Sequence, residues 1–183
     1  MSERRVQRKL RRQKRRSNRR SRRQIRGSVV LNRLLRVSLG PWLINKFNVH
    51  AENTHQVKAL QPPFVVVPNH SCVWDPFMVN NFVPGPIHYV VSDANFRSRI
   101  MEFGLSLVGS IPKTKVMSDL DAVKNIMRVK ERGGIIGVFP EGQSTWDGQT
   151  LPLYYSTAKL LKVLKAPVVT ARLTGAFLSQ PRW

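Results

Sequence analysis

The sequence is poor in cysteine, in acidic side chains and in long apolar runs. Cys72 is the only cysteine, which excludes an internal disulfide and fits a reducing compartment. The chain of 183 residues has 10 acidic side chains against 31 Lys and Arg, a net charge of +21. A chain so short of carboxylates is predicted to meet a polyanion, either a nucleic acid or an anionic membrane face.

Long apolar runs are also missing. No stretch of about 18 continuous apolar residues exists, so we expect no membrane-spanning helix. The longest uncharged runs, 61–74 and 76–92, are interrupted by proline and asparagine. The basic N-terminus is not followed by the apolar run and small-residue cleavage site of a signal peptide. The length and a hydrophobic content of 42% fit one globular domain with its own core.

The positive charge is concentrated at the N-terminus. Residues 1–26 contain twelve Arg, two Lys and one Glu, a net charge of +13. Almost nothing in this basic arm can be buried and its charges repel one another, so we expect it to be disordered. Residues 27–47 have apolar side chains at helical spacing. They are predicted to form two short amphipathic helices, broken at Gly40-Pro41, that lie in a membrane interface.

Residues 48–183 predict an α/β domain. Helical patterns begin at Asp75-Pro76, a helix cap followed by a first-turn proline, and at Ser118, which forms a capping box with Asp121. A third helix is expected over 156–164. Apolar runs typical of buried strands cover 64–67, 87–91, 135–139 and 168–173. The alternation of these strands with helices predicts a sheet flanked by helices, and we expect a mixed sheet.

A histidine and a carboxylate follow the first predicted strand. His70 lies in the loop after that strand, and Asp75 stands where the next helix begins. Such a pair is the minimum for a general base and the carboxylate that fixes its tautomer. Five residues span about 140° of a helix, so the loop must fold back to bring the two together. Alternatively, Asp75 is only a helix cap and His70 an ordinary loop residue.

Two more polar clusters follow apolar segments. In the first, Glu141 and Gly142 stand where the strand 135–139 runs into a polar loop. In the second, Lys113 and Lys115 offer two cations suited to a phosphate. Taken separately, the first cluster is also typical of a simple turn and the second of a solvated loop.

The clusters in this order resemble the glycerophospholipid acyltransferase family, the group that contains 1-acyl-glycerol-3-phosphate acyltransferases. Asn69, His70 and Asp75 match its Asn-His-x-x-x-x-Asp signature. Residues 139–142 match its Phe-Pro-Glu-Gly signature about seventy residues later. The resemblance covers residues 48–178 and implies an α/β fold.

Two weaker blocks accompany these motifs, and two positions depart from the family pattern. Residues 109–112 fall where the family has a glycine-led block, and 166–169 where it has a proline-containing apolar block. The first block usually ends in arginine, whereas Lys115 holds that place here. After Phe-Pro-Glu-Gly the family usually has Thr-Arg-Ser, whereas 143–145 read Gln-Ser-Thr. The cation usual in that loop is therefore absent.

The resemblance implies an O-acyltransferase that needs no cofactor and no metal. The acyl donor is expected to be acyl-CoA or an acyl-carrier protein, and the acceptor a lysophospholipid. No covalent acyl-enzyme is implied. His70 would deprotonate the acceptor hydroxyl and Asp75 would hold the imidazole, while a lysine would hold the acceptor phosphate. The substrate-binding residues implied are Asn69, Lys113, Lys115, Glu141 and Gly142.

Lipid substrates imply work at a bilayer surface. The segment 27–47 would insert its apolar residues while its cations snorkel to the headgroups. The basic arm would add roughly 1 kcal/mol per cation near an anionic surface. We expect a peripheral protein on the cytoplasmic face of a membrane. The alternative is that 27–47 packs on the domain as ordinary core.

Other functions stay open at this point. A nucleic-acid-binding protein would use the arm for counterion release, but the arm has no aromatic side chain to stack on bases. An inactive lipid-binding family member is a second alternative. Family members usually continue for several tens of residues beyond the point corresponding to Trp183, so the chain is either naturally short or its sheet is incomplete. A third is a different acceptor lipid.

Overall fold

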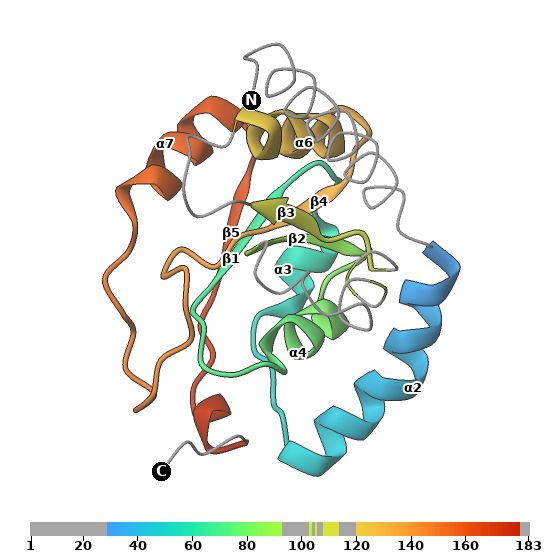
Figure 1. Ribbon diagram of the computed structural model, residues 1–183. Coiled ribbons are helices and arrows are strands. Elements are labelled where there is room, and N and C mark those ends of the chain that lie inside the picture. The colour runs from blue at the N-terminus through green and yellow to red at the C-terminus, as the bar shows by residue number, and fades with distance from the viewer. Residues whose placement is uncertain (1–28, 93–102, 104, 106–107, 114–119, 180–183) are drawn as a thin grey trace, which may run out of the picture.

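The computed structural model describes residues 29–92, 103, 105, 108–113 and 120–179 (Figure 1). Its centre is one sheet with the strand order β3-β2-β4-β1-β5. The predicted α/β class with flanking helices is confirmed, and all pairings among the described strands are parallel rather than mixed. The strands are β1 (Val65–Pro68), β2 (Ile87–Ser92), β3 (Ile111–Lys113), β4 (Ile135–Gly137) and β5 (Val168–Ala171).

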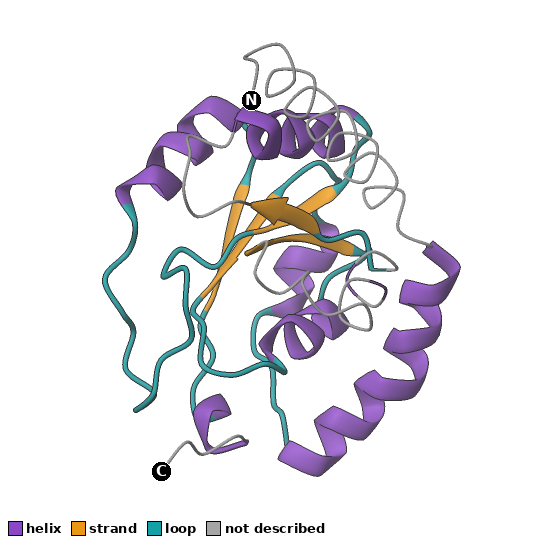
Figure 2. Cartoon of the chain, in the orientation of Figure 1, coloured by secondary structure: helices purple, strands orange, loops and turns teal. Residues whose placement is uncertain are grey.

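Helices cover both faces of the sheet (Figure 2). One face packs against α6 and α7, the other against α3 and α4, and α2 lies outside α4 (Figure 1). Helical crossovers such as β1–α4–β2 make parallel pairing possible. The bounds are α2 (Val29–Phe47), α3 (Thr54–Ala59), α4 (Asp75–Phe82), α6 (Leu120–Glu131), α7 (Tyr155–Leu164) and the 3₁₀ helix η2 (Ala176–Ser179).

The burial of strand β1 on both faces explains why its sequence is continuously apolar. Val65 packs into the core under α6 and α7, where it meets Ile126 and Leu164. Val66 points the opposite way, into the core beneath α3 and α4, beside Val79. Because both faces of a parallel sheet are buried, its strands need apolar side chains at successive positions. This places the end of β1, and the loop that follows it, in a rigid setting.

One strand was not predicted, and one helix ends where it was predicted to end. Strand β3 was not predicted, because it has three residues and contains Pro112, which an edge strand tolerates. Helix α6 ends as predicted, with Gly133 at a φ of 70°. The capping residue expected for that helix, Ser118, lies outside the described residues.

The predicted break in the N-terminal helical segment is wrong. Helix α2 runs unbroken through Gly40-Pro41. Proline removes one intrahelical hydrogen bond and normally kinks a helix. Here a Cβ on Gly40 would lie 2.1 Å from Oδ1 of Asn81 in α4, and Leu43 is completely buried. Close packing on α4 therefore holds the helix together across the proline.

Helix α2 is buried on one side and exposes several apolar side chains on the other. The side toward α4 buries Asn32, whose Oδ1 accepts a hydrogen bond from Asn80 Nδ2 at 3.2 Å. The opposite side carries Val30, Leu34 and Val37, which are 69%, 59% and 70% exposed. These three residues are called the α2 stripe. An exposed apolar stripe at helical spacing marks an interaction surface. In the described ranges no helix is both long and apolar enough to cross a bilayer.

Candidate active site

The loop between β1 and α4 brings His70 and Asp75 together. Nδ1 of His70 lies 2.9 Å from Oδ2 of Asp75. The loop folds back as this pairing requires, through a turn in which the Asp75 N–H donates to the Cys72 carbonyl at 3.3 Å. Asp75 is the first residue of α4, and the cap position is Trp74. The predicted cap role is therefore wrong, because the carboxylate turns back to the loop instead of capping the helix.

Asp75 is a fully buried carboxylate with several donors. Its Oδ2 accepts the backbone N–H groups of Ser71 and Cys72 besides the His70 ring. Its Oδ1 accepts the Cys72 thiol at 3.1 Å. Its position in the first turn of α4 adds the favourable field of a helix N-terminus. Such donors are what a buried ionised carboxylate requires.

The His70 ring is held from both sides while staying accessible. With a proton on Nδ1 directed at Asp75, Nε2 carries the lone pair of a general base. One ring face stacks on Phe139 at a centroid distance of 4.2 Å, and Phe139 in turn stacks on Tyr89 at 5.3 Å. The His70 side chain stays 22% exposed. The stack restricts ring rotation and leaves an edge open to a substrate.

Glu141 lies behind His70, in contact with its backbone. The Glu141 side chain is 2% exposed. Its Oε1 accepts the His70 N–H at 3.2 Å and its Oε2 accepts the Leu151 N–H at 3.3 Å. The Thr145 N–H donates to the His70 carbonyl at 2.9 Å. The loop after β4 thus holds the backbone of His70 on both sides.

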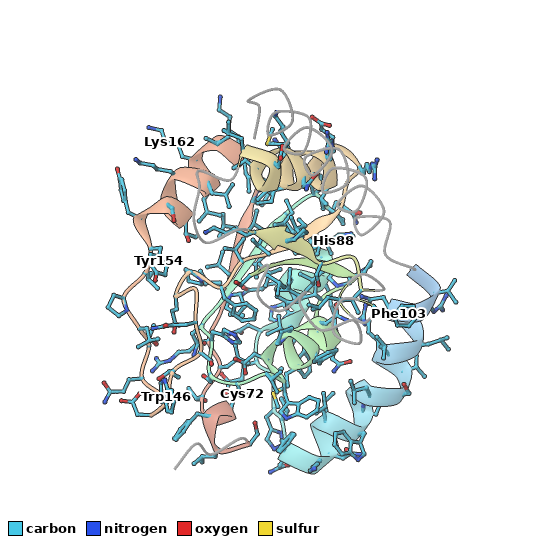
Figure 3. The ribbon with its side chains drawn as sticks, viewed as in Figure 1. Cys72, His88, Phe103, Trp146, Tyr154 and Lys162 are labelled. Atoms are coloured by element: carbon cyan, nitrogen blue, oxygen red, sulfur yellow. The ribbon has the colours of Figure 1, made fainter. Side chains whose placement is uncertain are left out.

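Gly142 makes this loop geometry possible. Its φ of 67° lies in the left-handed region that favours glycine. A Cβ there would lie 2.6 Å from a ring carbon of Tyr154, which Figure 3 labels at the edge of the molecule. The Tyr154 N–H closes the same loop by donating to the Pro140 carbonyl at 2.9 Å. A side chain at position 142 would displace that ring.

Asn69 ties the loop to the end of β5. Its Oδ1 accepts the Leu173 N–H at 2.6 Å, and its Nδ2 donates to the Leu173 carbonyl at 3.0 Å. This two-way clamp joins residues 104 positions apart. Both ends of the amide are therefore engaged by backbone in this structure. The contact of Asn69 with substrate stays a prediction.

Of the two predicted phosphate-binding cations, Lys113 lies in β3, an edge strand of the sheet. Lys113 is exposed at the carboxyl end of β3, and Lys115 lies outside the described residues. Strands β2 and β4 separate β3 from β1. Three inter-strand steps of about 4.8 Å put the two strand ends about 14 Å apart. An extended lysine and a glycerol phosphate together span a gap of this size.

Three residues around the pair were missed by sequence reasoning as functional positions. Burial raises the pKa of Cys72 to about 11 and also raises the pKa of Tyr89. Both groups are therefore neutral at physiological pH. Tyr89 lies in β2, and Phe139 follows the neighbouring strand β4. Alternate residues of a strand share a face, so the position of Tyr89 two residues after the apolar Ile87 was the available signal.

A metal is not supported by any cluster in the part of the chain that the structure describes. No group of three or more His, Cys, Asp or Glu side chains there is arranged to hold one. His88, for example, is partly buried, and its Nδ1 lies 2.8 Å from the Gly109 carbonyl.

Comparison with known proteins places this geometry in context. A family model described as "Acyltransferase" matches residues 46–174, which include both loops of the site. A curated 1-acyl-sn-glycerol-3-phosphate acyltransferase from Bacillus subtilis (strain 168) is 24% identical over 146 residues, which cover 79% of this chain and 68% of that protein.

A solved structure supports the fold. The crystal structure of the 1-acyl-sn-glycerophosphate (LPA) acyltransferase PlsC from Thermotoga maritima matches with a TM-score of 0.58 at 17% identity. The match covers 69% of this chain and 51% of that one. The chain therefore spans about half the length of that solved protein.

Proposed function

Since the chain belongs to the acyltransferase family, we propose that it transfers a fatty acyl group from an acyl thioester to the hydroxyl of a lysophospholipid such as 1-acyl-glycerol-3-phosphate. The observation that carries the proposal is the contact of 2.9 Å between His70 Nδ1 and a fully buried Asp75 carboxylate. The donor is acyl-CoA or an acyl-carrier protein. The product is a phospholipid precursor, which fits the curated relative's name.

In the proposed reaction His70 moves one proton. Nε2 takes the proton of the acceptor hydroxyl as the hydroxyl oxygen attacks the thioester carbonyl carbon. The tetrahedral intermediate expels the thiolate, which breaks the C–S bond, and the thiolate takes the proton from the imidazolium. Asp75 stabilises that imidazolium and fixes the ring tautomer. An ester and a free thiol leave, and neutral His70 is restored.

The state of the Cys72 thiol is consistent with direct transfer of the acyl group from donor to acceptor. Cys72 is 1% exposed and its pKa is raised to about 11 by burial. A thiol with so little thiolate at neutral pH is a poor nucleophile. Its hydrogen-bonding directions are also taken up by Asp75 and Ser179. These features support a mechanism without an acyl-cysteine intermediate.

For the acceptor, we propose that Lys113 and Lys115 bind the phosphate as point charges. Asn69 and Gly142 shape the acceptor site through the loops that they hold in place, and Glu141 acts through the His70 backbone that it holds. Lysine in place of a bidentate arginine predicts a tolerant phosphate site. An acceptor with a substituted phosphate is then a substrate as well.

We further propose that the protein works as a peripheral protein on the cytoplasmic face of a membrane, with the α2 stripe as the inserted element. The stripe is apolar, exposed and beside the basic arm, 1–26, in sequence. In the last turn of the same helix, Lys46 lies 4.6 Å from the Trp42 ring centroid, an aromatic and cationic pair suited to the headgroup region. An apolar stripe with flanking cations binds such an interface.

The testing experiment is acyl transfer on vesicles. Purified protein receives long-chain acyl-CoA, or an acylated carrier protein in a second series, with lysophosphatidic acid in anionic vesicles, and the released thiol is measured. We expect turnover that His70→Ala abolishes. His55→Ala, which removes an exposed histidine of α3, is the matched control and keeps full activity. Turnover retained in His70→Ala would refute the mechanism, and no turnover with either donor would refute the proposed reaction.

A further inference from the structure

Cys72 donates a hydrogen bond to each of the two oxygens of the Asp75 carboxylate. The backbone N–H of Cys72 donates to Oδ2 at 2.9 Å, and the Cys72 thiol donates to Oδ1 at 3.1 Å. A single residue that touches both oxygens fixes the rotation of the carboxylate plane. The orientation of that plane determines whether the hydrogen bond between Asp75 Oδ2 and His70 Nδ1 is linear.

The thiol itself is held in place. Cys72 is 1% exposed, and its Sγ lies 3.3 Å from the Ser179 hydroxyl in η2. The same hydroxyl lies 2.7 Å from the Ala176 carbonyl, which fixes Ser179 within its own helix turn. Figure 3 labels Cys72 at the end of the molecule that also carries η2. The sulfur is thus clamped between the carboxylate and a second structural element.

We propose that Cys72 is a positioning residue for the acyl transfer, acting through Asp75: its thiol donates a hydrogen bond that keeps this carboxylate aimed at His70. The inference rests on the proposed function for its catalytic consequence. The hydrogen bond itself is independent of any substrate. The sulfur takes no part in bond making or breaking.

Physical chemistry explains why a donor is needed at this position. A fully buried carboxylate loses its hydration, so hydrogen-bond donors must replace the lost water. A carboxylate held in a fixed orientation stabilises the imidazolium that forms at His70 without having to reorganise. A thiol is a weak donor, but it is neutral and fits a space that excludes water. The ionisable groups facing Asp75 are His70 and Cys72 from its own loop and Tyr89 from β2.

Two substitutions of the same sulfur separate positioning from packing. Both Cys72→Ser and Cys72→Ala remove the large sulfur atom, but serine keeps a donor and alanine does not. With lysophosphatidic acid vesicles, we expect alanine to lower kcat roughly 10- to 100-fold with KM within about twofold, and serine to recover most of the loss. Equal losses in both variants, or a change confined to KM, would overturn the proposal.

A spectroscopic measurement tests the hydrogen bond without any activity. The S–H stretching band lies in a clear region of the infrared spectrum, and Cys72 is the only thiol in the chain. We expect the band of the native protein to lie at lower frequency than that of the same protein unfolded in urea, because the thiol donates to an anion. We expect Asp75→Asn to move it back toward the unfolded position.

The activity assay and the infrared band contradict different parts of the proposal. A native band at the unfolded frequency would overturn the positioning role even in an active enzyme. A shifted band in a protein that transfers no acyl group would overturn the proposed reaction and, with it, the catalytic part of this inference. If Cys72→Ala does not fold, the band of the unaltered protein still decides whether the bond exists.

Discussion

Replacing Glu141 by glutamine tests whether this carboxylate acts on the acceptor or on His70. In the structure its two oxygens accept the N–H groups of His70 and Leu151, at 3.2 and 3.3 Å. A hydrogen bond to a charged group contributes about 1.5–3 kcal/mol. Glutamine keeps one carbonyl acceptor but turns its NH₂ group toward the other amide, so one buried N–H loses its acceptor.

We expect Glu141→Gln to lower the free energy of unfolding by about 2 kcal/mol, the contribution of one such bond. Loss of a backbone hydrogen bond at this loop also displaces His70, so kcat should fall at least tenfold, which corresponds to about 1.4 kcal/mol in the activation barrier. The KM for the acceptor should not change. Urea unfolding and the thiol-release assay provide the three numbers. Glu131→Gln, at the exposed end of α6, is the control and should change none of them.

The opposite pattern would refute this reasoning. A raised KM for the acceptor, with kcat and the unfolding midpoint unchanged, would mean that Glu141 reaches the substrate directly. The resemblance to the acyltransferase family implies such a contact. The structure instead shows Glu141 2% exposed and engaged by two backbone amides.

Three more predictions concern stability and binding. Burial lowers the pKa of His88, so below about pH 6.5 the unfolded chain binds a proton at this residue more readily than the folded chain does. The free energy of unfolding should therefore fall as the pH drops below about 6.5. In urea titrations, His88→Asn should make the free energy of unfolding less dependent on pH. Gly142→Ala should cost roughly 1–3 kcal/mol in the same assay, because its φ is 67°; an unchanged midpoint would contradict the close packing of that loop. Changing Leu34 and Val37 together to aspartate should weaken co-sedimentation with anionic vesicles without changing the unfolding midpoint, since both already face solvent; undiminished binding would rule out the α2 stripe as the membrane element.

Much of the sheet was predictable from local sequence. Four of the five strands were predicted because parallel strands buried on both faces give continuous apolar runs, as in 64–67. Strand β3 lacks that signal, since it has three residues at an edge and contains Pro112. The parallel direction of every pair depends on crossover geometry, which no single run of residues encodes.

The N-terminal helix shows how tertiary packing overrides a strong local signal. Gly-Pro is among the clearest helix breakers in a sequence. The contact that keeps α2 continuous is the approach of Gly40 to Asn81, 41 positions further along the chain. A pattern within 27–47 contains no information about that partner. The segment does expose apolar side chains, and its contact with a membrane interface stays a prediction.

The central pair of the site was predictable from the sequence, whereas the contacts of the residues that surround it were not. The motif spacing indicated His70 and Asp75, and the structure brings them to 2.9 Å. The direction of Glu141 could not be predicted, because it depends on how the loop after β4 lies against the loop after β1. The part played by Cys72 depends likewise on η2, more than a hundred residues away.

The contact between Trp42 and Trp74 has a geometric consequence for substrate choice. Trp42 of α2 packs edge-on against Trp74 of the loop that carries His70, at a centroid distance of 6.4 Å. The helix proposed to rest on the bilayer is therefore in contact with the loop that carries His70, the proposed base. With α2 seated on lipid as proposed, this contact would set the height of the imidazole above the membrane plane. The proposed reaction would then favour an acceptor hydroxyl that lies at that height.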